Sequence, residues 1–227
     1  MRIVTFNIKH GLATGSWWRV DVGRLAGVCA GFDADLLTLQ EVDRRSLRTL
    51  FSDEVEVVSR ATGLAAAFGE TRRSLLRGHY GNALFARGPF SDLEVMALPR
   101  PDGGEPRVAI LATAPAAGTS VSVAATHLSI RHREARLQLA TVLESLGRRP
   151  LPRLVFGDLN LEPDMVEPVV TAAGYVLAST GPTFPTDRPD RRIDYVAVKG
   201  LTVVEADAPA VGISDHRPVV AIARPPG

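Results

Sequence analysis

Eight polar side chains stand next to apolar, strand-like stretches of this sequence, where the edge of a sheet would present them together. They are carboxylates, side-chain amides and imidazoles, the groups that bind hard cations, orient water and transfer protons. Taken singly, each has an ordinary structural role, such as a turn former, a solvated acid or a satisfied core histidine. Their repetition at strand ends favours one shared chemical site. The residues are Asn7, Glu41, His127, Asp158, Asn160, Asp194, Asp215 and His216.

The stretch GISDHRPVV (212–220) illustrates the choice between the two interpretations. A polar turn before a buried strand would explain it, and so would a catalytic pair held at a sheet edge. Because consecutive residues of an extended chain point to opposite faces, Ser214, Asp215 and His216 cannot form a serine-hydrolase triad by themselves. The sequence also contains no GxSxG turn and no HExxH motif, and its single cysteine excludes a cysteine-based zinc site.

Seven short motifs, taken in chain order, resemble the endonuclease/exonuclease/phosphatase superfamily, which includes pancreatic-type deoxyribonucleases, abasic-site endonucleases, neutral sphingomyelinases and inositol polyphosphate phosphatases. They span residues 5–219, and their combination is far more specific than any one of them. The resemblance implies a divalent-metal-dependent hydrolase of nuclease or phosphodiesterase type, in which water attacks a phosphodiester in line. The motifs are TFNI (5–8), LQEVD (39–43), YGNALF (80–85), THLS (126–129), GDLN (157–160), RIDYV (192–196) and SDHRPV (214–219).

The resemblance also implies a role for each residue of the metal and water sites. Glu41 would hold Mg²⁺ or Mn²⁺ through its hard carboxylate oxygens, with Asn7 and Asp215 as supporting ligands, direct or through water. Asp158 would orient and deprotonate the attacking water. Asn160 would contact a phosphate oxygen or hold Asp158 in place.

Further residues are expected around the phosphate and the rest of the substrate. His127 and His216 would stabilise the developing charge, and Asp194 would fix the ring of His216 and raise its pKa. His10 stands where some nucleases of the superfamily carry an acidic or neutral residue, which speaks against a two-metal site. The expected substrate contacts are Tyr80, Asn82, Arg107, Arg131 and His10.

The substrate itself is less well defined by the sequence. Trp17 and Trp18 would stack on a base, touch lipid headgroups or pack on the first helix. Nucleic acid, DNA or RNA, is favoured; the alternatives are a phospholipid headgroup, a small phosphoester, or an inactive phosphate-binding module. Arginines near the motifs would form either a positive rim or solvated loops. They are Arg72, Arg73, Arg77, Arg131, Arg133, Arg188, Arg191 and Arg192.

Length and composition are consistent with this assignment. The chain has 227 residues, of which 45% are hydrophobic, which suits one domain over residues 1–227 with a sizeable core. Its 26 cationic and 25 anionic residues exclude an overall basic coat. No stretch approaches the roughly 18 apolar residues of a membrane span, and no signal-peptide pattern occurs. We therefore expect a cytoplasmic monomer without an obligate protein partner.

Apolar periodicity predicts the elements that must position these residues. About ten strands are too many for one open sheet, so we predict an α+β fold: a four-layer α/β/β/α sandwich with two packed, mostly antiparallel sheets. Ser52 is the expected N-cap of the second helix, and the strands between 80 and 128 are expected to form hairpins. Helices are predicted over 20–32, 51–63, 131–147 and 163–174, and strands over 2–8, 34–42, 80–86, 93–98, 107–114, 120–128, 153–160, 192–200, 202–208 and 218–223.

Overall fold

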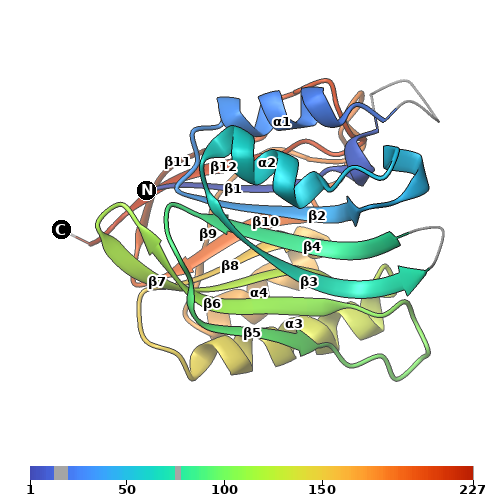
Figure 1. Ribbon diagram of the computed structural model, residues 1–227. Helices are drawn as coiled ribbons and strands as arrows, with labels where there is room; N and C mark the ends of the chain where they lie inside the picture. The colour runs from blue at the N-terminus through green and yellow to red at the C-terminus, as the bar shows by residue number, and fades with distance from the viewer. Residues whose placement is uncertain (13–19, 75–77, 227) are drawn as a thin grey trace.

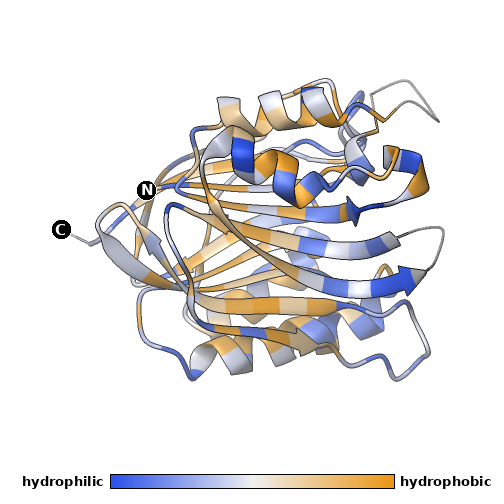
Figure 2. Ribbon diagram, viewed as in Figure 1, coloured by the Kyte–Doolittle hydropathy of each residue, from blue (hydrophilic) through white to orange (hydrophobic). Residues whose placement is uncertain are grey.

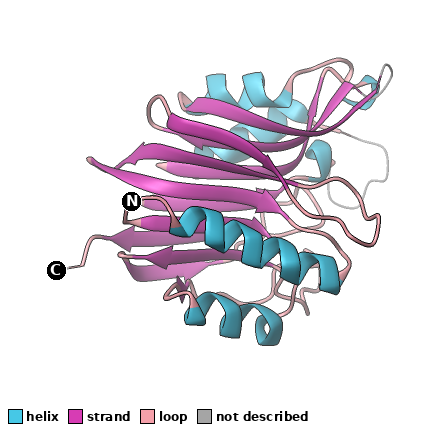
Figure 3. Cartoon of the chain, turned by 90° about the horizontal axis from the view of Figure 1, so that it is seen from below, coloured by secondary structure: helices cyan, strands magenta, loops and turns pink. Residues whose placement is uncertain are grey.

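The computed structural model, which describes residues 1–12, 20–74 and 78–226, has four layers. Two six-stranded sheets pack face to face (Figure 1). Helices α1 (Val22–Gly31) and α2 (Glu54–Thr62) cover one outer face, and α3 (His132–Gly147) and α4 (Pro163–Ala172) cover the other. Seen from below, two helices lie across the strands of the nearer sheet (Figure 3). The predicted α/β/β/α sandwich is confirmed. Trp17, Trp18 and Arg77 lie outside the described residues.

Each sheet contains a single parallel pair of neighbouring strands, β1–β2 in the first and β7–β8 in the second, so both are mostly antiparallel, as predicted. In spatial order the first sheet comprises β11 (Thr202–Asp207), β12 (Val219–Arg224), β1 (Arg2–Asn7), β2 (Leu36–Arg44), β4 (Gly78–Ala86) and β3 (Ala65–Ser74). The second comprises β5 (Ser91–Ala97), β6 (Val108–Ala116), β7 (Thr119–His127), β8 (Arg153–Asp158), β10 (Asp194–Lys199) and β9 (Val176–Leu177).

The two parallel pairs explain why the polar motif residues meet. Parallel strands end at the same edge of a sheet, so β1 and β2 end together, and β7 and β8 end with His127 directly beside Asp158. Strand β10 runs the opposite way and begins at this edge, with Asp194 paired to Asp158. Both chain termini lie at the other end of the molecule (Figure 1).

Alternation along the strands builds three separate hydrophobic cores. In β1, Ile3 packs between the sheets, whereas Val4 packs under the first helix layer. In β8, Phe156 packs between the sheets and Val155 under the second helix layer. Hydrophobic residues therefore occupy the middle of the strands, and hydrophilic residues lie at the C-terminal ends of β2 and β3 (Figure 2). The cores hold the strand ends rigidly in register.

Two strands were absent from the sequence prediction. Strand β3 begins with three alanines, which are weak strand formers, and ends in a charged segment, so its pattern did not alternate clearly. Strand β9 has only two residues. The expected run of hairpins over 80–128 is also wrong in one respect: β4 pairs with β3 in the first sheet, and β5 opens the second sheet.

Two local predictions were wrong: the residue that caps α2 and the residue at which β2 ends. The N-cap of α2 is Asp53, not Ser52, since the carboxylate of Asp53 accepts a hydrogen bond from the amide of Glu56. Strand β2 runs beyond its predicted end at Val42, as far as Arg44, after a bulge between Leu39 and Val42. Glu41 lies in this bulge with a φ of 59°, while Gln40 is fully buried.

The close approach of β7 and β8 generates a stability prediction at Gly157. A Cβ there would lie 1.9 Å from the backbone oxygen of Thr126, and the φ of 151° belongs to a region that only glycine adopts readily. We expect Gly157→Ala to lower the free energy of unfolding by at least about 1–3 kcal/mol, measured by urea denaturation.

The matched control is Gly27→Ala, on the exposed face of α1, where an added Cβ meets no atom within 4 Å. This change is expected to stabilise the protein by up to about 1 kcal/mol, because alanine favours helix. Equal unfolding free energies for wild type and Gly157→Ala would contradict the proposed close approach of β7 and β8.

Candidate active site

A cavity of about 430 Å³ opens where the carboxyl ends of the two parallel pairs meet. The floor brings together residues from both sheets and from the loop before β12. The lining residues are Asn7, Glu41, Tyr80, Glu105, Arg107, His127, Ile130, Asp158, Asn160, Phe184, Arg191, Ile193 and His216.

The side-chain amide of Asn7 joins the two sheets at the cavity floor. Its Nδ2 donates to Glu41 Oε1 at 3.1 Å and to Asp158 Oδ2 at 3.0 Å. Its Oδ1 accepts the backbone N–H of Lys9 at 3.1 Å. The amide therefore fixes the positions of two carboxylates that would otherwise repel each other, and it is itself almost fully buried.

The carboxylate of Asp158 lies buried among groups that hold it in one orientation. Oδ1 accepts the backbone N–H of Asn160 at 3.0 Å, and Asn160 is fixed in turn by donating its side-chain amide to the Leu128 carbonyl. Burial and the nearby charge of Asp194 raise the pKa of Asp158 above the usual carboxyl range. A raised pKa makes Asp158 a better proton acceptor near neutral pH than a solvated carboxylate.

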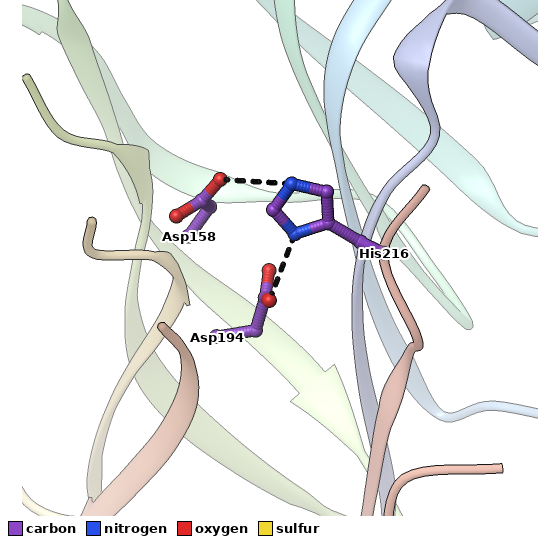
Figure 4. Close-up of side chains that lie close together, drawn as sticks. All are labelled: Asp158, Asp194 and His216. Atoms are coloured by element: carbon purple, nitrogen blue, oxygen red, sulfur yellow. Dashed lines mark hydrogen bonds and ion pairs between the residues drawn. The ribbon is translucent and has the colours of Figure 1, made fainter. Parts of the chain in front are cut away.

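His216 and Asp194 form a buried ion pair facing Asp158 (Figure 4). The His216 Nδ1 donates to Asp194 Oδ2 at 2.9 Å, and its Nε2 lies 3.9 Å from Asp158 Oδ2. Thr183 Oγ1 also donates to Asp194 Oδ2, at 2.6 Å. Burial by itself would lower the pKa of His216, but the charge and hydrogen bond of Asp194 outweigh it and raise the value to about 10. His216 is therefore a cation at neutral pH, as the sequence predicted.

His127 provides the contrasting, neutral imidazole. Its Nε2 lies 3.5 Å from Asp158 Oδ2. Burial, followed by the positive charges of Arg107 and His216, holds the pKa of His127 well below its ordinary value. Arg107 is itself only 6% exposed and pairs with Glu105 at 3.2 Å. The site thus places one charged imidazole, one neutral imidazole and a buried guanidinium around the same cavity.

Tyr80 lines the cavity near Glu41. Two guanidinium groups contact its ring, those of Arg72 at 4.9 Å and Arg48 at 5.7 Å. Burial and the charge of Glu41 raise the pKa of the Tyr80 hydroxyl, so it stays protonated and can donate a hydrogen bond.

Asp158, Asp194 and His216 offer donor atoms that lie within 4.8 Å of one another and could hold a metal ion. A hydrogen bond from Nδ1 to Asp194 would by itself leave Nε2 free for a metal, but the raised pKa of His216 keeps a proton on both ring nitrogens, and an imidazolium has no free lone pair to bind a metal. The carboxylate of Glu41 lines the same cavity and supplies the hard oxygen donors that Mg²⁺ and Mn²⁺ prefer. The chemistry of the donor atoms thus favours Glu41 over the Asp158, Asp194 and His216 group as the metal-binding residue.

Three predicted site residues are hydrogen-bonded or ion-paired to groups outside the cavity lining. Asn82 is buried and donates to the carbonyl of Val108, and Asp215 pairs with Lys9. The guanidinium of Arg131 donates to the carbonyl of Asp102 on a neighbouring loop. These three residues do not line the cavity within the described part of the chain.

Three further predicted residues also lie outside the cavity lining. Burial lowers the pKa of His10 to about 4, with a contribution from Arg48. Arg133 binds Asp102, and Arg192 donates to the carbonyl of Ala178. Among the arginines that the sequence singled out, Arg107 and Arg191 line the cavity over the described residues.

The structure also adds residues that sequence reasoning missed. Phe184 packs its ring 4.8 Å from that of His216, and the guanidinium of Arg191 lies 5.8 Å from the Phe184 ring. Thr183 holds Asp194, and Lys9 holds Asp215. The loop residues Thr183 and Phe184 carried no sequence signal, because no apolar period leads up to them. Lys9 could have been noticed as one of only two lysines in an arginine-rich chain.

Backbone strain gathers at this edge. Non-glycine residues with positive φ are uncommon, yet five of them flank the site, where the surrounding hydrogen bonds hold them. Glu41, for example, owes its orientation to the bulge in β2. The residues are Lys9 (φ 45°), His10 (47°), Glu41 (59°), Asn160 (50°) and Ser214 (69°).

Comparison with known proteins agrees with this geometry. A model of the Endonuclease/Exonuclease/phosphatase family matches residues 4–216. Comparison with curated proteins gives no match. A solved endonuclease/exonuclease/phosphatase from Beutenbergia cavernae is 25% identical, with a TM-score of 0.85, over 100% of this chain and 72% of that chain.

Two further solved structures share the fold at lower identity. The D. rerio TDP2 complexed with single-strand DNA product is 19% identical, with a TM-score of 0.75, over 99% of this chain and 98% of that one. A mannosyl-6-phosphatase from Bacteroides thetaiotaomicron is 17% identical, with a TM-score of 0.78, over 99% of both chains.

The His216–Asp194 pair generates a prediction about protonation. Asp194→Asn removes the negative charge that keeps His216 protonated, so burial dominates and the pKa of His216 is expected to fall from about 10 to below its ordinary value. The measurement is an NMR titration of the histidine ring signals, with His216→Ala used to assign the signal.

The raised pKa of His216 also determines how the stability of the protein changes with pH. Because the folded-state pKa lies above the ordinary value of about 6.5, the pair contributes stability at low pH that is lost as the pH rises through the folded value. The control is His132→Ala, on the exposed start of α3, which should leave the His216 titration unchanged. An unaltered His216 titration in Asp194→Asn would contradict this account of the pair.

Proposed function

The chain belongs to the endonuclease/exonuclease/phosphatase family, whose members are divalent-metal-dependent hydrolases of phosphoesters, and from this membership we propose that it cleaves a phosphodiester by in-line attack of water. One observation carries the proposal. The buried carboxylate of Asp158 lies 3.5 Å from one imidazole and 3.9 Å from another at the floor of the cavity. A proton acceptor thus lies beside two imidazoles that can donate hydrogen bonds to a phosphate.

The residues divide the reaction between them. Asp158 accepts a proton from water as the water oxygen forms a bond to phosphorus, and its raised pKa favours that transfer. The bond from phosphorus to the leaving oxygen breaks on the opposite side of the phosphate. The charged His216 and the neutral His127 donate hydrogen bonds to the phosphate oxygens, where negative charge develops. Asn160 keeps the Asp158 carboxylate aligned.

Glu41 is the residue that would hold the metal. Mg²⁺ is commonly bound through one or two carboxylates, with waters and substrate phosphate completing its shell. Asn7 supports this role indirectly, because its amide is committed to Glu41, Asp158 and the amide of Lys9. When bound, the metal would neutralise phosphate oxygens and polarise the bond that breaks. Mg²⁺ or Mn²⁺ suits these oxygen donors.

A nucleic-acid strand is the substrate that we propose. Arg107 and Arg191 line the cavity and supply positive charge, although each also pairs with a carboxylate, Glu105 at 3.2 Å and Glu162 at 2.7 Å. The ring of Phe184 lines the cavity beside His216 and supplies an aromatic surface for a base. The TDP2 structure with its DNA product is a precedent on the same fold. A monomeric state, a single domain over 1–227, a cytoplasmic location and the lack of an obligate protein partner stay predictions. Within the described residues, no helix is long and apolar enough to cross a membrane.

A small phosphoester is the second candidate, because the cavity of about 430 Å³ encloses little more than one phosphate and its attached group. The mannosyl-6-phosphatase is a precedent for that class. The discriminating experiment is an activity panel of single-stranded DNA, RNA, plasmid DNA, an abasic-site duplex, sphingomyelin, a sugar phosphate and bis-p-nitrophenyl phosphate, each with Mg²⁺, Mn²⁺ or excess EDTA. Full activity in EDTA would contradict the metal requirement.

Replacing Asp158 tests the proposed base. Asp158→Asn keeps the size of the side chain but loses its basicity, so the rate should fall by at least about 10²–10⁴-fold, while substrate binding is nearly retained. The control is Asp164→Asn, an exposed carboxylate in the first turn of α4. If Asp158→Asn kept more than about half of the wild-type rate, another group would have to activate the water.

Replacing Arg191 tests the substrate class. In the inactive Asp158→Asn background, Arg191→Ala should weaken binding of a fluorescent single-stranded oligonucleotide. The slope of log K against log salt should shrink by about 0.7 for each phosphate that the variant no longer binds. Arg60→Ala, on the exposed surface of α2, is the matched control. An unchanged slope in Arg191→Ala would favour a small phosphoester instead.

A further inference from the structure

The carboxylate of Asp215 lies against a cation that the chain itself supplies. Lys9 Nζ is 2.5 Å from Asp215 Oδ2. Apart from Lys199, every other cationic residue in the sequence is an arginine. The ammonium group is a compact point charge, whereas a guanidinium is broad and planar. Lysine therefore resembles a small metal ion more closely than arginine would in the same place.

The two chain segments that carry this pair are hydrogen-bonded to Asn7, the residue that joins the two sheets. The backbone N–H of Lys9 donates to Asn7 Oδ1 at 3.1 Å, and Ser214 Oγ donates to the Asn7 carbonyl at 2.6 Å. Lys9 and Ser214 both have positive φ, a conformation that the surrounding hydrogen bonds hold in place. The backbone beside the pair therefore belongs to the site framework, whereas the side chains of Lys9 and Asp215 are 37% and 34% exposed.

We propose that the Lys9 ammonium takes the place of a second divalent cation at Asp215, so that the site binds a single metal ion, at Glu41. This inference rests on the proposed function. In the wild type, Lys9 neutralises Asp215 at every metal concentration. Without Lys9, Asp215 would be an uncompensated carboxylate close to Asn7, and its oxygens would attract a hard cation.

The test is calorimetric titration of the full chain with Mn²⁺, which measures stoichiometry without any substrate. We expect one bound Mn²⁺ per wild-type chain and none in Glu41→Gln.

Lys9→Met should bind a second Mn²⁺, and the double variant Lys9→Met/Asp215→Asn should return to one. Lys9→Arg keeps the charge and should bind one. Asp215→Asn alone should keep one Mn²⁺, with a Kd raised by less than about 10-fold, which is the smallest effect typical of losing an outer-shell partner, because Lys9 stands between Asp215 and Asn7.

The outcomes separate this inference from the proposed function. Two Mn²⁺ ions bound to the wild type would overturn the inference and leave the phosphoesterase proposal intact, and so would a single Mn²⁺ in folded Lys9→Met. A large loss of Mn²⁺ affinity in Asp215→Asn would also overturn it, even if Lys9→Met failed to fold. Absence of Mn²⁺ binding by the wild type would instead contradict the metal-dependent function itself.

Discussion

The side-chain amide of Asn7 is the interaction on which the site depends, because it connects carboxylates that belong to different sheets. Glu41 lies on β2 of the first sheet, Asp158 ends β8 of the second, and Nδ2 of Asn7 donates to both. Without a donor between them, the buried carboxylate of Asp158 and the partly buried carboxylate of Glu41 would repel each other. The packing of the sheets therefore fixes the distance between the metal-binding group and the water-activating group that we propose.

The charges around this amide are arranged in pairs. The buried carboxylate of Asp194 accepts hydrogen bonds from His216 and Thr183 through Oδ2, and Asp215, which is 34% exposed, pairs with Lys9. Burying an unpaired charge would cost several kcal/mol. The raised pKa of Asp158 reflects the incomplete compensation at that position, and an easily protonated carboxylate is what a general base requires.

The sequence predicted the layers of the fold and the residues of the cavity floor, because both follow from strand periodicity and from motifs at strand ends. It did not predict β3, whose alanines and charges hide the alternation, nor the bulge that turns Glu41. Partners from loops, such as Phe184 and Lys9, depend on tertiary packing that no local pattern encodes. Arg131 was misplaced because sequence proximity to His127 does not fix the direction of a long side chain.

The most direct measurement is a crystal structure of the protein with Mn²⁺ and vanadate, using the anomalous signal to locate the metal. The account predicts a manganese peak at Glu41, with vanadate between His127 and His216 and its apical oxygen facing Asp158. A manganese ion held by Asp158, Asp194 and the ring nitrogen of His216 would contradict it, because those residues would then form the metal site instead of the proton-transfer site.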